Sequence, residues 1–317
     1  MRALITGING FVGGYLADHL LNLGIEVWGT DLVKDLTFRN NNINYRQMDI
    51  LNYSEVQKVL DECLPDYIFH LAAQSSAAIS WDNPQMTMNV NVNGTINLLE
   101  SIRCMRENFG NNPKILLIGS SEEYGFVNQE DMPIGEKQKV NPGNPYAVSK
   151  IAQTLLGQVY ARAYGLNIVM VRAFNHIGPK QSPTFVVADF AKRIAEIEKG
   201  RREPILLVGN LEAERDFTDV RDIVEAYNRL IEQGKAGEIY NVGSGKAYKI
   251  QYLLDCLLSY TKINIRIEND PDRMRPSDVP IIYCDSSKIQ SIINWQPKHK
   301  IEDTLFEVLT YWRQEIN

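Results

Sequence analysis

The 317-residue sequence predicts an α/β fold in which a doubly wound parallel sheet is joined to a smaller α/β lobe. Three observations predict this fold. Short β-branched runs alternate with segments of helical periodicity over residues 1–175. A glycine-rich turn stands between the first predicted strand and the first predicted helix. After residue 175 the alternation gives way to a loop with glycine and proline and to a charged stretch, GNLEAERDFTDVRD.

The composition excludes several classes of protein. With 44% hydrophobic and 23% charged residues, the chain can bury a sizeable core and is not intrinsically disordered. Its net charge of −6 gives no overall attraction to nucleic acid or to anionic lipid, so we expect neither partner. The N-terminus reaches glycine before a signal peptide could form, and no apolar run approaches the ~18 residues of a membrane span, so we expect a cytoplasmic protein. Four widely spaced cysteines without a CxxC pair predict neither disulfides nor a metal site.

Each predicted element has a local reason in the sequence. Strands are predicted where β-branched residues cluster, and helices where apolar residues recur every three or four positions. The helix at 145–164 has a clear start, because Asn144 can cap it and Pro145 suits its first position. The predicted strands are 3–6, 26–30, 67–71, 114–118, 168–172 and 239–242, with one more before Asp49, and the predicted helices are 11–23, 54–64, 84–106, 145–164 and one ending near 199.

The turn after the first strand has the pattern TGxxGxxG. Gly7 allows a tight turn, Gly10 lets the backbone approach a pyrophosphate, and Gly13 lets the helix pack closely on the strand. The helix N-terminus adds N–H donors and a favourable dipole. A structural turn would also use glycine, but the position between a hydrophobic strand and an amphipathic helix favours a dinucleotide cofactor on a Rossmann-type sheet. The cofactor-binding residues predicted here are Gly7, Asn9, Gly10, Phe11, Val12 and Gly13.

An acidic residue at the end of the second strand bears on the choice of cofactor. Asp31 follows Gly7 by 24 residues, close to the ~20-residue offset at which a carboxylate accepts hydrogen bonds from an adenosine ribose. This favours NAD, with Leu32 beside the ribose. Lys34 and Arg39 lie nearby and could hold a 2′-phosphate, so NADP stays open. A purely structural aspartate is the alternative interpretation.

Further strand ends are expected to line the same cofactor, because open parallel sheets bind ligands at the carboxyl ends of their strands. Asp49 and Ile50 follow the third strand, and we expect them at the adenine, one as an acceptor and one as a cover for a ring face. Leu71, Ala72 and Ala73 follow the fourth strand, where small side chains suit close passage of the backbone past a ligand.

Two segments carry the candidate catalytic groups. Tyr146 and Lys150 form YxxxK, and their i,i+4 spacing puts both on one face of a helix. A neighbouring ammonium is expected to lower the tyrosine pKa from ~10, so that Tyr146 can exchange a proton. Ser120, Ser121 and Glu122 lie in GSSEEYG, which follows a buried-looking strand and is expected beside the cofactor. An exposed helix face and a polar turn are the alternatives.

Four motifs together give a specific resemblance: TGxxGxxG, LAAQ, GSSEEYG and PYAVSK. They resemble the extended short-chain dehydrogenase/reductase (NAD-dependent epimerase/dehydratase) family that acts on nucleotide sugars, over nearly the whole chain. The resemblance implies a catalytic triad of Ser120, Tyr146 and Lys150, with Lys150 also holding the nicotinamide ribose. Because one fold carries several reactions, the activity must be read from the site.

The second half resembles the branch of this family that handles GDP-mannose derivatives, through AAQSSAAISWDNP, RAFNHIGP, GNLEAERDFTDVRD and RPSDVP. A nucleotide-sugar diphosphate needs cations, and an asparagine in FNH is implied near the diphosphate or the sugar. We interpret His70 and His176 as structural. The predicted substrate-binding residues are Ser120, Ser121, Glu122, Asn175, Lys192, Arg201, Arg215 and Arg275, of which Arg215 and Arg275 are favoured.

Two reactions of this branch compete. A GDP-mannose 4,6-dehydratase needs a carboxylate base, and Glu122 occupies the place of that glutamate. A GDP-4-dehydro-6-deoxy-D-mannose reductase needs only hydride from NAD(P)H and a proton from Tyr146, and it gives GDP-D-rhamnose (GDP-6-deoxy-D-mannose). Glu123 stands at a usually apolar position of the dehydratases, and the segment after Asp31 is short, so the resemblance favours the reductase. The dehydratase and another nucleotide-sugar epimerase or reductase remain alternatives.

The predicted domains are interleaved. The dinucleotide-binding domain comprises 1–174 and about 219–248, because the strand at 239–242 is expected to rejoin the first sheet; the substrate lobe comprises 175–218 and 249–317. A dinucleotide-sensing module without turnover is disfavoured, since both Tyr146 and Lys150 are retained. The family resemblance implies a homodimer through the helices at 84–106 and 145–164, although their apolar faces could also pack within one chain.

Overall fold

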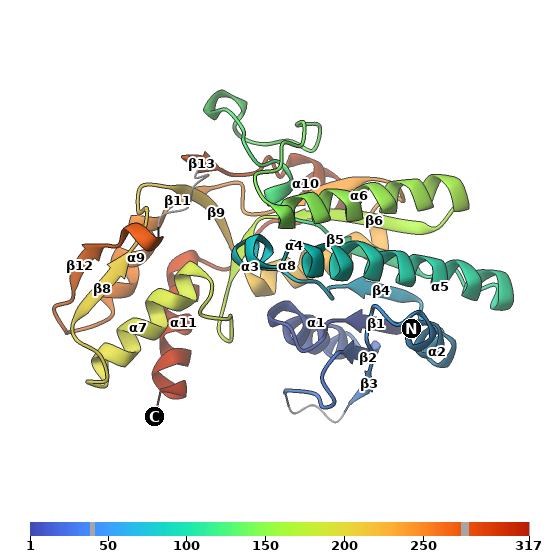
Figure 1. The fold of residues 1–317 in the computed structure, drawn as a ribbon, viewed down its shortest axis with the longest axis horizontal. Helices are drawn as coiled ribbons and strands as arrows, with labels where there is room; N and C mark the ends of the chain where they lie inside the picture. The colour runs from blue at the N-terminus through green and yellow to red at the C-terminus, as the bar shows by residue number, and fades with distance from the viewer. Residues whose placement is uncertain (39–41, 274–278, 317) are drawn as a thin grey trace.

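The computed structural model describes residues 1–38, 42–273 and 279–316. Its centre is a seven-stranded, all-parallel sheet with the strand order β10-β6-β5-β4-β1-β2-β3 (Figure 1). From β1 the chain adds strands in one direction, and from β4 it adds them in the other, so the switch point lies between β1 and β4. The strands are β1 (Arg2–Thr6), β2 (Glu26–Asp31), β3 (Ile43–Gln47), β4 (Tyr67–His70), β5 (Lys114–Ile118), β6 (Asn167–Ala173) and β10 (Ile239–Val242).

Helices cover both faces of this sheet, which confirms the doubly wound prediction. A buried cluster that includes Leu16, Tyr227 and Trp295 joins one face to α1, α8 and α10, and a second cluster that includes Leu60 and Leu98 joins the other face to α2 and α5. Both faces of the central strands are therefore apolar, as a parallel sheet requires. The helices are α1 (Phe11–Asn22), α2 (Tyr53–Cys63), α5 (Gly94–Phe109), α6 (Pro145–Tyr164), α8 (Val220–Gln233) and α10 (Ser287–Ile293).

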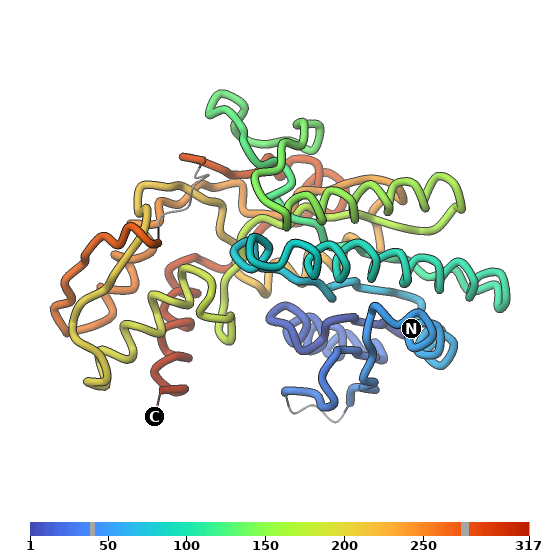
Figure 2. The backbone as a smooth tube through the Cα atoms, in the orientation of Figure 1, coloured from blue at the N-terminus to red at the C-terminus, as the bar shows by residue number. Residues whose placement is uncertain are grey.

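The second lobe has its own core and lies beside the carboxyl ends of the sheet strands (Figures 1 and 2). Its helices α7 (Val186–Glu198), α9 (Ile250–Ser259) and α11 (Ile301–Glu315) pack against one another through an apolar cluster that includes Phe190, Leu254 and Leu305. Its strands are β7 (Asn175–Ile177), β8 (Ile205–Val208), β9 (Glu214–Asp219), β11 (Ala247–Lys249), β12 (Arg266–Asn269) and β13 (Ile281–Ile282). The chain also forms three short 3₁₀ helices: η2 (Ser121–Glu123) and η3 (Gln129–Asp131), between β5 and α6, and η4 (Pro271–Arg273), after β12.

A buried carboxylate connects the two lobes. Asp216 on β9 accepts hydrogen bonds from the backbone N–H groups of Ser244 at 2.8 Å and Gly245 at 2.9 Å, in the loop after β10, and from that of Cys284 at 3.3 Å. Because burial of an unpaired carboxylate is costly, these donors fix the position of β9 relative to the sheet. β10 pairs in parallel with β6, so the strand at 239–242 rejoins the central sheet.

The helix predicted at 84–106 is divided into three segments in the structure. The short α3 (Ala77–Asp82) precedes it, and it then runs as α4 (Pro84–Met88), the π turn η1 (Asn89–Asn93) and α5. The π turn coincides with Asn91, whose buried amide bonds to the backbone N–H and C=O of Gln74 at 2.8 and 3.0 Å. An inserted residue in a helix redirects a side chain in this way. Of the described helices, none has the length and apolar character needed to cross a membrane.

Substitution of Gly13 tests the packing of α1 on the glycine-rich turn after β1. An added Cβ would lie 2.3 Å from the carbonyl oxygen of Ile8, so we expect Gly13→Ala to lower the free energy of unfolding by about 1–3 kcal/mol. The neighbouring Gly14→Ala is the control, because its Cβ would lie 3.6 Å from the Phe38 ring and alanine favours helix. Urea unfolding followed by circular dichroism measures both. Equal midpoints for the two variants would contradict this account.

Candidate active site

The glycine-rich turn lies at the switch point of the sheet. Gly7 has a φ of 74°, and a Cβ there would lie 2.7 Å from the backbone nitrogen of Ala72, so the strand ends of β1 and β4 approach without space for a side chain. Gly10, by contrast, is exposed and has no side chain with which to cap α1. The N–H groups of Phe11 and Val12 in the first turn are therefore directed outward. This cradle fits a pyrophosphate.

Asp31 lies beside this turn, at the end of β2. Its carboxylate accepts hydrogen bonds from the backbone N–H groups of Asn9 at 3.1 Å and Leu32 at 2.8 Å. The loop after Asp31 folds back onto Asn9, whose side-chain oxygen accepts from the Thr37 N–H at 2.8 Å. Half-exposed Asp31 keeps lone pairs for ribose hydroxyls. Lys34 is exposed nearby, whereas Arg39 lies outside the described residues.

The residues predicted at the adenine, Asp49 and Ile50, follow β3, and the other residues predicted to line the cofactor follow β4. Asp49 accepts from the Leu51 N–H at 2.9 Å and is half-buried. Ile50 is buried and contacts α5, where a Cβ on Gly94 would lie 2.9 Å from its Cγ2. Half-buried Leu71, Ala72 and Ala73 continue from β4 next to the glycine-rich turn. All of these residues meet at the same edge of the sheet, although Ile50 has little surface left to offer.

The structure brings together the predicted triad. Tyr146 and Lys150 lie on α6, which Asn144 caps by accepting from the Ala147 N–H at 2.8 Å, and both side chains are buried. Ser120 follows β5, and its hydroxyl lies near the Tyr146 phenol. The Lys150 ammonium donates to the carbonyl oxygen of Ile118 at 2.7 Å and to the side-chain oxygen of Gln153 at 3.0 Å.

The pKa values of the triad correct one expectation. The Lys150 ammonium was expected to lower the pKa of Tyr146, but its Nζ lies 6.0 Å from the centre of the phenol ring and is bonded elsewhere. Burial instead raises the pKa of Tyr146, while the Ser120 hydroxyl opposes this rise. Burial lowers the pKa of Lys150 to about 8. At neutral pH Tyr146 is therefore a phenol that can donate its proton, and most of Lys150 is charged.

The side chains of the two glutamates of GSSEEYG differ in burial and in hydrogen-bond partners. Glu122 is half-buried, and its carboxylate accepts from the side-chain amide of Asn144 at 3.0 Å. Ser121, also half-buried, begins η2 beside it. Glu123 is fully buried and pairs with Arg172 of β6 at 2.9 Å. The position of Glu123, which is usually apolar in the dehydratases resembled here, thus holds the acidic member of a buried ion pair.

Asn91 and Ser149 belong to the site but were missed in the sequence. The Asn91 amide donates to the Ser149 hydroxyl at 2.8 Å while it holds Gln74, so it ties the segment after β4 to α6 next to Tyr146. The Ser149 hydroxyl in turn donates to the Tyr146 carbonyl at 2.7 Å. The π turn that directs Asn91 inward leaves no pattern in a single sequence.

The two histidines interpreted as structural, His70 and His176, each contact side chains of the fold. His70 lies between the hydroxyls of Thr6 at 2.8 Å and Thr95 at 3.1 Å, and burial lowers its pKa to about 3, so it is neutral. Thr95 donates to the Asn91 carbonyl, which leaves its oxygen to accept from Nε2–H of His70. The ring of His176 stacks on Phe11 with centroids 6.0 Å apart, and burial lowers its pKa.

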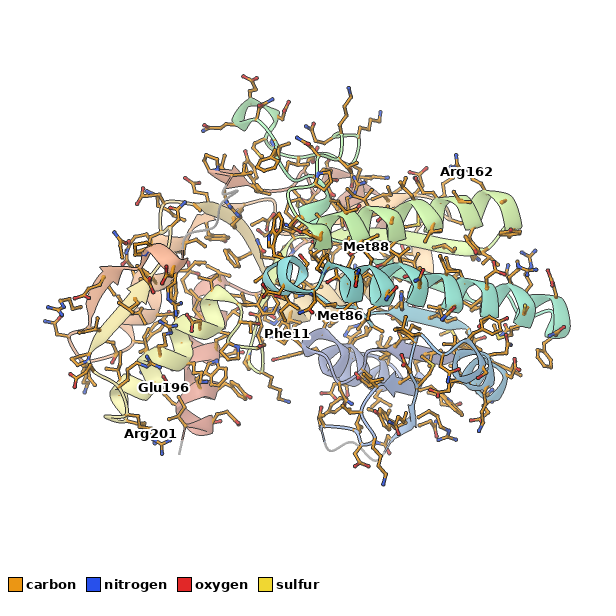
Figure 3. The ribbon with its side chains drawn as sticks, viewed as in Figure 1. Phe11, Met86, Met88, Arg162, Glu196 and Arg201 are labelled. Carbon is orange, nitrogen blue, oxygen red and sulfur yellow. The ribbon has the colours of Figure 1, made fainter. Side chains whose placement is uncertain are left out.

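The second lobe brings some of the predicted substrate-binding residues to the sheet and not others. Asn175 is exposed just after β6 and donates to the Asp216 carbonyl at 3.1 Å, while half-buried Arg215 is the neighbour of Asp216 on β9. Lys192 on α7 lies over the Trp312 ring at 5.6 Å. Arg201 lies near Glu196 at the tip of the lobe, away from Phe11 (Figure 3), so it is not brought to this site. Arg275 lies outside the described residues.

Comparisons with known sequences agree with the motifs. The family model described as GDP-mannose 4,6 dehydratase matches residues 4–308. GDP-6-deoxy-D-mannose reductase of Pseudomonas aeruginosa is 32% identical over 315 residues, which cover 99% of this chain and 98% of that protein. GDP-mannose 4,6 dehydratase 2 of Arabidopsis thaliana is 31% identical and covers 93% of this chain and 82% of that protein.

Solved structures show the same fold. RMD from Pseudomonas aeruginosa complexed with NADPH has a TM-score of 0.85 and 30% identity and covers 99% of both chains. UDP-glucose 4-epimerase of Thermus thermophilus in complex with NAD has a TM-score of 0.87 and 28% identity over the full length of both chains. With a matching fold and family model, the chain belongs to the GDP-mannose 4,6 dehydratase family of NAD(P)-dependent nucleotide-sugar enzymes.

Proposed function

We propose that this enzyme is a GDP-4-dehydro-6-deoxy-D-mannose reductase that converts the C4 ketone of its substrate to the alcohol and yields GDP-D-rhamnose (GDP-6-deoxy-D-mannose). The reductase from Pseudomonas aeruginosa supports this, since the similarity covers 98% of that protein against 82% of the Arabidopsis dehydratase. The short loop after Asp31, folded back onto Asn9, supports it too, because the dehydratases resembled here carry a longer segment.

The observation that carries the proposal is the protonation of the triad. A reductase needs an acid at the carbonyl oxygen as negative charge develops there. Tyr146 remains a phenol at neutral pH and lies near the Ser120 hydroxyl, so both can donate to that oxygen. After the proton leaves Tyr146, the Ser120 hydroxyl, which opposes the rise of the Tyr146 pKa, stabilises the phenolate, and the Lys150 ammonium acts on it only from a distance, with its Nζ 6.0 Å from the ring centre. Burial of Tyr146 and Lys150 excludes water and strengthens both interactions.

The cofactor in this proposal is NADH or NADPH, which supplies hydride to C4 when it is bound. Gly7, Gly10 and Gly13 form the cradle for its pyrophosphate, and Lys150 and Tyr146 would face its nicotinamide ribose. We propose a preference for NADH, because the Asp31 carboxylate would accept hydrogen bonds from the ribose hydroxyls and would repel a 2′-phosphate. NADPH is the alternative cofactor, because the similar Pseudomonas structure is complexed with NADPH.

The nucleotide sugar would bind between the two lobes. In this proposal Asn175, which donates to the Asp216 carbonyl, and Arg215 would contact the diphosphate, and Lys192 on α7 is kept as a third candidate. We retain Arg275 in this proposed set. The proposed division is a dinucleotide-binding domain of 1–174 and about 219–248 and a substrate lobe of 175–218 and 249–317, from which α10 departs by packing on the central sheet.

A dehydratase is the second candidate, and one observation favours it. The Glu122 carboxylate lies two residues after Ser120, where a base could remove a proton from C5 before elimination of water. Its bond to Asn144 anchors it at the start of α6. The Thermus structure, a UDP-glucose 4-epimerase, has the same fold, so an epimerase remains an outcome of the activity test.

We also propose a homodimer through α5 and α6, which lie side by side along one face (Figure 1). Val148, Leu155 and Val159 recur at i, i+7 and i+11 on α6 and are 44%, 54% and 46% exposed. A second copy would cover this apolar stripe.

The purified protein should oxidise NADH, and NADPH more slowly, only with GDP-4-dehydro-6-deoxy-D-mannose. Absorbance at the nicotinamide band and the sugar products report the reaction. Incubation with GDP-mannose is the matched control and should leave it unchanged. Conversion of GDP-mannose to the ketosugar without net cofactor use would overturn the reductase and make Glu122 a base. A higher kcat/KM with NADPH would overturn only the role of Asp31.

Paired variants separate the acid from the glutamate. Tyr146→Phe removes the proton donor and should lower kcat by about 10²–10⁴-fold, with KM for the nucleotide sugar little changed. Glu122→Gln keeps its bond to Asn144 and should retain most of the activity. Steady-state kinetics of both variants measure this. Full activity of Tyr146→Phe would remove the triad assignment.

Leu155→Glu places a charge in the middle of the exposed stripe on α6 and should give a monomer. Sedimentation velocity of the wild type and the variant measures this. Glu substitution of Leu207, which is 38% exposed on β8 of the second lobe, is the control and should leave the assembly unchanged. A wild-type monomer at micromolar concentration would refute the dimer.

A further inference from the structure

We infer that Glu123, in its ion pair with Arg172, is a positioning residue that locks the Ser120 segment onto the catalytic face of α6 and supplies a negative charge behind the triad. The carboxylate is completely buried and does not face the cleft. It therefore acts through other residues, and this inference rests on the triad used in the proposed function.

The hydrogen bonds of Glu123 carry the first part of the argument. Its Oε1 accepts from the backbone N–H of Ser120 at 3.0 Å and from the Thr154 hydroxyl at 3.1 Å. Thr154 follows Lys150 by four residues, and Lys150 follows Tyr146 by four, so these side chains share one face of α6. One oxygen atom thus connects the catalytic serine with the helix that carries the other two groups.

The local sequence provides space for this carboxylate. Gly119 precedes Ser120, and a Cβ there would lie 2.2 Å from Oε1 of Glu123. The side chain of any other residue would displace the carboxylate from Ser120. The absence of a side chain at Gly119 therefore makes room for the Glu123 carboxylate within GSSEEYG.

Arg172 keeps the carboxylate charged and in place. Its Nε donates to the second oxygen of Glu123 at 2.9 Å, and its guanidinium lies 4.6 Å from the centre of the Tyr124 ring. Donors therefore act on both oxygens, which is the pattern of an ionised carboxylate. Burial raises the pKa of Glu123, and Arg172 opposes that rise.

The charge also faces the catalytic pair. Among titratable groups, Glu122 and Glu123 from η2 act on Tyr146, and Glu123 also acts on Lys150. His70 from β4, which is neutral, is affected by Lys150, and the Tyr227 phenol from α8 is affected by Tyr146. Burial lowers the pKa of Lys150, and Glu123 opposes this, so the glutamate helps to keep the ammonium charged. Both Glu123 and Glu122 raise the pKa of Tyr146, which keeps the phenol protonated. Loss of Glu123 would lower both pKa values.

Two double variants test positioning and charge separately. Loss of one charge alone leaves the other buried without a partner, so both are removed together. Glu123→Gln with Arg172→Met removes the charges but retains an oxygen that accepts from Ser120. Glu123→Leu with Arg172→Met removes that acceptor as well. Glu225→Gln is the control, because Glu225 lies on α8 outside the site and pairs with two cations, Arg229 and Lys298.

The readouts are kcat, KM and the pH profile of kcat, measured with the nucleotide sugar that the wild type converts, together with melting temperature and NADH binding. The wild-type kcat should fall as pH rises through about 8, where Lys150 loses its proton. The glutamine variant should move this limb to lower pH. The leucine variant should also lose about 100-fold in kcat with KM within about twofold, the size of effect seen when one donor to an oxyanion is lost.

Folded double variants with the wild-type kcat and the wild-type basic limb would overturn the inference. A wild type without turnover of any nucleotide sugar would instead refute the proposed function. If neither double variant folds, Thr154→Val decides, since it removes only the link to α6. It should lower kcat about tenfold, and Thr154→Ser should restore it. A wild-type kcat in Thr154→Val would then refute the positioning role.

Discussion

The close approach of β1 and β4 at their carboxyl ends is the constraint on which the rest of the molecule depends. Gly7 meets the backbone of Ala72 with no space for a side chain, and Thr6 and His70 pair across the same strand ends. This contact opens the crevice at the switch point and fixes the glycine-rich turn, the segment after β4 and the start of α1 relative to one another. The cofactor cradle is therefore a property of the sheet.

The catalytic groups depend on a second layer of buried polar contacts. Asn91 ties the segment after β4 to α6, and Glu123 ties the segment after β5 to the same helix. Both side chains are buried and fully engaged with backbone or side-chain groups. Such contacts hold a few reactive atoms within a fraction of an ångström, which is what proton transfer requires.

The sheet and the segments that carry Ser120, Tyr146 and Lys150 can be predicted from the sequence because their causes are local. A glycine pattern, an Asn-Pro helix start and an i,i+4 pair each act within a few residues, and α6 and β5 begin and end at the predicted residues. The direction of the Tyr146 pKa shift was wrong, because burial and the bonds of Lys150 arise only in the folded chain. The Glu123–Arg172 pair spans 49 residues, and Arg201 lies away from the site for reasons of tertiary packing alone.

The position of β10 has a consequence for synthesis of the chain. β10 forms one edge of the central sheet and covers β6, a strand whose residues Ile168 to Ala173 are all buried in the finished fold. Some 65 residues, which include the first part of the second lobe and α8, leave the ribosome between these two strands. Throughout that interval β6 is an apolar, unpaired edge, the kind of surface that recruits strands from other chains. The nascent first domain is thus exposed to aggregation until residue 242 has emerged.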